Sequence, residues 1–129
     1  MTIDEYISKQ APDRAEAFTM LHKLIMENKK VTAKVSKMMG KDMIIYKTNN
    51  YFIYALGSGK SHMSLHAMPI YASKAIHEKY TKLLPDASLQ KGCINFKSAV
   101  EMPPAIIRQF LGECAQIDMA ALMEKFKKK

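Results

Sequence analysis

Four short apolar segments separated by tight turns constrain the fold of this chain more than any other feature. In chain order the segments are 31–38, 43–46, 51–56 and 62–68. They have the length of strands, and the turns between them carry glycine or asparagine, at 40–42, 48–50 and 57–60. Strands joined by such short turns pair antiparallel, because parallel neighbours need a crossover of a dozen or more residues. The sequence therefore predicts an antiparallel meander in the middle of the chain.

Helical patterns flank this meander on both sides. Thr2 and Glu5 have the spacing of a capping box, which marks the start of a first helix. Further helices are predicted from Pro12 to about residue 28, from about 73 to 83 and after Pro104, with a fifth strand at 93–96.

The length of 129 residues fits one domain, spanning 1–129. We predict an α+β fold, a single-domain sandwich in which an antiparallel sheet of about five strands is packed by N-terminal, middle and C-terminal helices.

Alternation along the fourth strand assigns its side chains to two faces of the sheet. Met63 and Leu65 belong on the face under the helices, so His62, Ser64 and His66 look away from them. Two histidines four residues apart on an extended chain lie about 13 Å apart, too far to share one metal ion.

The third strand, 51–56, is apolar on both faces, which predicts that something covers its second face. Three possibilities stay open from the sequence. Helices pack against both faces, a second copy of the chain forms a homodimer there, or the face forms a ligand pocket.

We expect the functional surface on the sheet face that carries His62, Ser64 and His66. Tyr54 and Asn95 join it if strand alternation brings them to that side. Lysines in the flanking turns would attract an anion, and these are Lys41, Lys60 and Lys91. The predicted partner is a small anionic ligand or a protein.

The chain carries a net charge of +8, with a basic tail at 125–129. A basic protein attracts phosphates, so non-specific nucleic-acid binding is an alternative function. Of the 20 basic residues only Arg14 and Arg108 are arginines. Sequence-specific reading of base edges depends strongly on arginine, so nucleic acid is not the expected partner.

The remaining reactive side chains predict no chemistry. Cys93 and Cys114 form no Cys-x-x-Cys motif and fall in apolar stripes, so we expect inert thiols. His22 and His77 are expected on outer helix faces. No nucleophile or acid–base pair stands at a catalytic spacing, so we predict neither catalytic residues nor a resident cofactor.

The sequence contains no stretch of 18 apolar residues, and its first residues are acidic and lack an apolar signal segment. These features predict a cytoplasmic protein without a membrane partner.

Several segments resemble the YdhG-like domain family, and together they cover essentially the whole chain. They are IDEYI (3–7), PDR (12–14), MMGKDM (38–43), YFIYAL (51–56), KSHMSLH (60–66), PIY (69–71), KGCINF (91–96) and MPP (102–104). The resemblance implies an α/β sandwich. Most members of this family have no established function. Because no catalytic spacing is present, we expect a non-catalytic binding module.

One branch of the family is described as frataxin-like intracellular iron chaperones, which offer ferrous iron through acidic surface residues. Under this alternative the resemblance implies that the carboxylates of the N-terminal helices bind iron, namely Asp4, Glu5, Asp13 and Glu16.

Overall fold

The computed structural model describes residues 1–38 and 40–127, with side chains through residue 124, so the side chains of the predicted basic tail lie outside the described residues. The elements are α1 (Ile3–Ser8), α2 (Pro12–Ile25), β1 (Val31–Met38), β2 (Lys41–Thr48), β3 (Tyr51–Ser58), β4 (Met63–Ala67), α3 (Met68–Ala72), α4 (Lys74–Leu83), β5 (Ser88–Leu89), β6 (Cys93–Phe96), the 3-10 turn η1 (Ala99–Glu101), α5 (Pro104–Cys114) and α6 (Met119–Lys127).

The described strands form one open antiparallel sheet in the order β1-β2-β3-β4-β6-β5. The α+β class and the meander from β1 to β4 are confirmed. The sheet has six strands rather than about five, because the two-residue β5 pairs with β6, placing Ser88 opposite Asn95. A strand of two residues is too short to leave an alternating pattern in the sequence.

The turns of the meander adopt backbone conformations that suit their residues. Asn49 and Asn50 have φ angles of 52° and 67°, and Gly40 has a φ of 79°. Positive φ at both central residues is typical of the tight hairpin turns whose twist matches that of the flanking strands. Asparagine and glycine tolerate this region, so the predicted turns hold β1, β2 and β3 in a fixed register.

Two helices were not predicted, α3 and α6. The fourth strand was expected to continue to residue 68, but it ends at Ala67 and α3 follows directly. Proline in the first turn of a helix is tolerated because its missing N–H would have no partner there. Pro69 therefore starts a short helix here, in addition to ending the strand.

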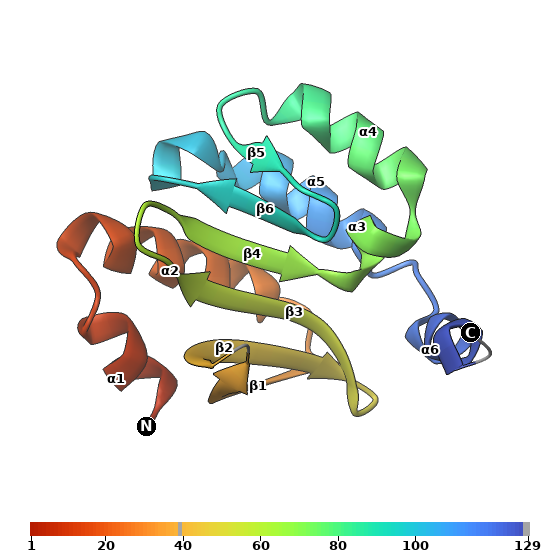
Figure 1. The fold of residues 1–129 in the computed structure, drawn as a ribbon, viewed down its shortest axis with the longest axis horizontal. Helices are drawn as coiled ribbons and strands as arrows, with labels where there is room; N and C mark the ends of the chain where they lie inside the picture. The colour runs from red at the N-terminus through yellow and green to blue at the C-terminus, as the bar shows by residue number, and fades with distance from the viewer. Residues whose placement is uncertain (39, 128–129) are drawn as a thin grey trace.

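The hydrophobic core lies between one face of the sheet and the helices. This core face carries Leu56, Leu65 and Ile94, and the helices contribute Phe18 and Phe110, all without exposed surface. In Figure 1, α2 and α5 pass behind the strands, on the side opposite to the viewer.

The central part of the second sheet face is not covered by the described helices. Ile45, Ser64 and His66 lie there and stay partly exposed. This excludes the possibility that helices pack against both faces throughout. None of the described helices is long and apolar enough to cross a bilayer.

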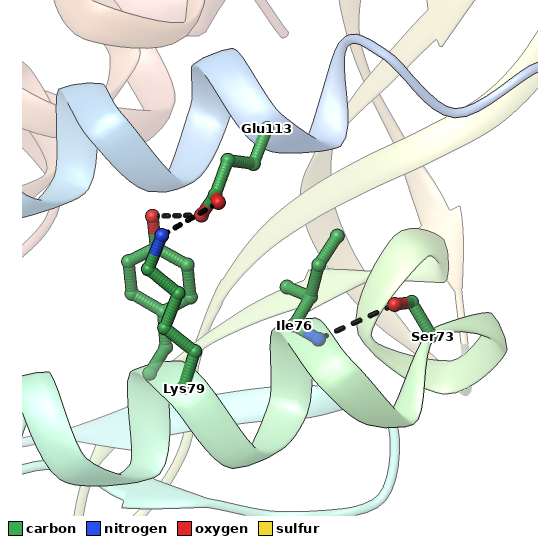
Figure 2. A network of polar contacts seen from close by, with 5 residues as sticks. Ser73, Ile76, Lys79 and Glu113 are labelled. Atoms are coloured by element: carbon green, nitrogen blue, oxygen red, sulfur yellow. Dashed lines mark hydrogen bonds and ion pairs between the residues drawn. The ribbon is translucent and has the colours of Figure 1, made fainter.

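Polar contacts hold α4 against α5, as Figure 2 shows. Ser73 Oγ accepts a hydrogen bond from the Ile76 backbone N–H at 3.2 Å and caps α4. Lys79 Nζ lies 2.7 Å from Glu113 Oε1, and the Tyr80 hydroxyl donates to the same carboxylate. Because Tyr80 is fully buried, this acceptor satisfies its hydroxyl.

Candidate functional site

The predicted polar face exists, and its centre is built by β4. Ser64 pairs with Gly57 of β3 and Asn95 of β6, and His66 lies opposite Cys93 of β6. The Ser64 hydroxyl donates to Asn95 Oδ1 at 2.7 Å, across two neighbouring strands. Alternation thus brings Ser64, His66 and Asn95 to one face, as the sequence predicted.

A hollow of about 210 Å³ opens on this face beside β4, and we call it the basic pocket. It is lined by Met38, Lys41, Met43, Gly57, Ser58, Gly59, His62, Ser64 and His66. One lysine and two histidines contribute to this lining, and none of the described residues contributes a carboxylate to it. The pocket therefore suits an anion better than a cation.

Gly57 and Met43 lie against each other in the lining of the basic pocket. A Cβ at this position would lie 2.2 Å from Cε of Met43, which is closer than any real contact. Because Gly57 has no side chain, the Met43 side chain lies across β3. The Met43 thioether therefore lies beside the backbone of Gly57 in the pocket.

The turn between β3 and β4 is held by a side chain from α2. Arg14 Nη1 donates to Ser58 Oγ at 2.5 Å and to the Gly59 carbonyl at 2.6 Å. Within the turn, the Gly59 N–H donates to the His62 carbonyl at 2.8 Å. These contacts fix the segment that places His62 at the pocket, although β4 begins only at Met63.

His66 is half-buried, and its surroundings disfavour its charged form. Burial lowers the pKa of His66, and the nearby Lys41 ammonium lowers it further. The imidazole is therefore mainly neutral at pH 7, with a positive charge beside it. An anion bound between the two groups would reverse this effect, because it favours the protonated ring.

Three residues predicted for the site lie elsewhere. Tyr54 is on the core face, where 3% of it is exposed, because it shares the parity of Leu56. Burial raises the pKa of Tyr54. Lys60 is exposed in the turn and does not line the basic pocket, and Lys91 lines a different hollow near His77.

The prediction for His22 was wrong. Its ring Nδ1 lies 2.7 Å from the hydroxyl of the fully buried Tyr46, and burial lowers the pKa of this histidine. His22 follows Phe18 by one helical turn, so it lies at the edge of the buried stripe of α2 and not on its outer face.

The two cysteines lie in different surroundings. Cys114 is buried against the core, and burial raises the pKa of its thiol to about 12. Cys93 is half-buried on the second sheet face, where its Sγ lies 3.6 Å from Asn95 Oδ1, and not in an apolar stripe as expected. Burial also raises the pKa of Cys93, so both thiols are protonated at neutral pH.

The four candidate iron ligands are exposed carboxylates on α1 and α2, namely Asp4, Glu5, Asp13 and Glu16. Glu5 completes the predicted capping box with Thr2, and Asp13 accepts the Arg14 backbone N–H. Across residues 1–38 and 40–127 no three His, Cys, Asp or Glu side chains form a group that could hold a metal ion.

Both arginines are engaged within the protein. Arg14 holds the β3–β4 turn, and Arg108 forms two hydrogen bonds to the Glu27 carboxylate, at 3.0 and 2.9 Å. The Glu27 contact raises the pKa of Arg108. The basic pocket and the sheet face around it therefore offer lysine, which binds anions without the paired geometry of a guanidinium.

Several residues of the basic pocket were not predicted from the sequence. Met38, Met43 and Gly57 line it from β1, β2 and β3. Alternation places Met43 on the same side of β2 as Lys41. This pattern could have indicated from the sequence that Met43 lies near the pocket. The close approach of Met43 to Gly57 follows from the strand pairing and leaves no pattern in the sequence.

Comparison of the chain with protein-family models, with curated proteins and with solved structures finds no match. Membership of the YdhG-like family therefore stays a prediction from the quoted segments.

Proposed function

We propose that this protein is a non-catalytic binding module that takes a small anionic ligand in the basic pocket. Lys41 supplies the fixed positive charge, and His66 becomes protonated when the anion enters. His62 lies at the pocket on the β3–β4 turn and adds a second imidazole.

One observation supports the proposal. Lys41, His62 and His66 surround a hollow, and none of the described residues that line it carries a carboxylate. The protonation of a neutral histidine next to a lysine changes when an anion binds between them. The histidine has little charge of its own at pH 7, and it gains a proton when an anion offsets the repulsion from Lys41. The affinity for a small, partly solvated anion should be weak, with a dissociation constant of about 1 mM.

The test is an NMR titration of the histidine rings with inorganic phosphate and with acetate. We expect both anions to shift the His66 signals and to raise the pKa of His66, because the bound charge stabilises the imidazolium. Affinity should therefore increase as the pH falls through the pKa of the bound form.

Two lysine variants separate the pocket from the general charge of the protein. Lys41→Gln should raise the pKa of His66 in the free protein, since the repelling ammonium is gone, and should weaken anion binding roughly threefold. Lys60→Gln removes the same charge from an exposed turn position and should change neither quantity. Equal effects of the two variants, or no response of His66 to either anion, would refute the proposal.

A further inference from the structure

The second sheet face continues beyond the basic pocket into a larger hollow. This hollow, which we call the sheet groove, has a volume of about 530 Å³ and lies over β1, β2 and the start of β3. It is lined by Thr32, Ala33, Lys34, Ser36, Lys37, Met38, Ile45, Lys47 and Phe52. Met38 lines both hollows, so the sheet groove and the basic pocket are neighbours on one surface.

The sheet groove has an apolar floor and a basic rim. Ile45 and Phe52 are partly exposed in it, at positions of an open sheet face where polar side chains are usual. Lys34 lies directly opposite Ile45, and Lys47 directly opposite Phe52. The hydrocarbon stems of lysines cover neighbouring apolar surface while their ammonium groups stay in water.

The basic pocket and the sheet groove both lie along β2. Lys41, Met43, Ile45 and Lys47 occupy alternate positions of β2 and therefore face the same side. Six residues of strand separate Lys41 from Lys47, a length of about 20 Å. A single extended ligand can therefore lie with one end in the basic pocket and its body over Ile45 and Phe52.

We propose that the ligand of this protein is a free long-chain carboxylate. This inference rests on the proposed function, because the carboxylate head occupies the anion position beside Lys41 and His66. The hydrocarbon chain lies along β2 in the sheet groove. Charge complementarity supports this choice: within the described residues, the lining of both hollows includes five lysine or histidine side chains beyond Lys41 and no carboxylate.

The volume of the sheet groove also favours a small amphipathic molecule. Pockets for such ligands usually measure about 300–1,000 Å³ and are mostly apolar with a few convergent polar groups. A hollow of about 530 Å³ with Ile45, Phe52 and Met38 in its lining fits this description.

The experiment compares acetate, hexanoate and decanoate, each below its micelle concentration, by calorimetry and by the His66 ring signals. Full burial of a methylene group raises affinity about fourfold. An open groove buries roughly half of each group, so we expect about a twofold gain per methylene. Decanoate should then bind at least tenfold more tightly than hexanoate.

Variants test where the carboxylate and the hydrocarbon chain of the ligand bind. Ile45→Thr keeps a β-branched strand residue but removes apolar surface, and it should weaken decanoate binding several-fold while the response to acetate stays unchanged. Val100→Thr makes the same kind of change at a position that is 83% exposed outside both hollows, and it should have no effect. Lys41→Gln should weaken the binding of acetate and of decanoate alike.

The outcomes separate this inference from the proposed function. Equal affinities along the chain-length series, or unchanged decanoate binding in Ile45→Thr, would overturn the inference and leave the anion site intact. Failure of acetate and phosphate to move His66 would overturn the proposed function, and the head-group position with it. Retention on phosphatidylglycerol vesicles without binding of free decanoate would also overturn the inference, because it indicates a membrane-facing surface.

Discussion

Single residues decide how the second sheet face is shaped, and Gly57 is the clearest case. Its missing side chain leaves room for Met43 over β3, and a Cβ would meet Met43 Cε at 2.2 Å. Gly112 offers a comparison, since a Cβ there would meet nothing within 4 Å. The same substitution should therefore have opposite effects at the two positions.

We expect Gly57→Ala to reduce the free energy of unfolding by about 1–3 kcal/mol, because Met43 must leave its place in a packed region. Gly112→Ala should increase it by up to about 1 kcal/mol, because alanine favours the helix that Gly112 weakens. Urea unfolding followed by circular dichroism measures both. A stabilising effect of Gly57→Ala would contradict the assigned packing of Met43.

Among the helices and strands, α4 connects the edge of the sheet to α5. Ser73 caps α4, and the Lys79 and Tyr80 side chains of α4 reach Glu113 of α5. The Tyr80 ring packs edge-on against Phe110, with ring centroids 5.0 Å apart. These contacts, a cap, an ion pair, a hydrogen bond and an aromatic contact, contribute to the position of α4.

Removal of the cap should loosen this connection. We expect Ser73→Ala to cost about 1 kcal/mol of stability, because the Ile76 N–H loses its acceptor. Ser73→Asp keeps an acceptor at the helix start and should retain wild-type stability. Thermal unfolding of the two variants beside the wild type decides this, and equal melting temperatures for the alanine and aspartate variants would count against the cap.

At the scale of the whole molecule, charge is divided between the two sides of the sheet. The net charge is +8, yet carboxylates such as Glu27 and Glu113 form ion pairs on helices. Among the described residues, the linings of the basic pocket and the sheet groove contain four lysines, His62 and His66 and no acidic side chain. This uneven distribution, more than the total charge, makes that face the binding surface in our proposals.

Global stability should depend on pH through two half-buried histidines. Burial lowers the pKa of His22 and of His66 below the ordinary value of 6.5. The unfolded chain therefore binds protons at a higher pH than the folded protein does. The contribution of these histidines is complete above about pH 6.5 and is lost as the pH falls from there through the folded pKa values.

We expect the free energy of unfolding to decrease below pH 6.5, with each histidine adding at most about 1.4 kcal/mol per pH unit. His22→Gln and His66→Gln should each flatten this dependence, and the double variant should flatten it most. Urea unfolding between pH 5.5 and 8 in a buffer free of phosphate and carboxylate provides the measurement. A wild-type stability that is constant over this interval would contradict the assignment.

Local patterns in the sequence were enough to predict the antiparallel meander, the capped first helix, the turns at Asn49–Asn50 and Gly40, and the side of β4 on which Ser64 and His66 lie. These features are local, because they depend on alternation along a strand and on the conformations that asparagine and glycine tolerate.

The register of the strand pairs and the positions of β6 and β5 beside β4 are known only from the folded structure. Strand pairing placed Gly57 beside Met43 and Lys41 near His66, and it joined the basic pocket to the sheet groove through Met38. It also put Tyr54 in the core and brought His22 to Tyr46. Such contacts join residues far apart along the chain, and no local periodicity encodes them.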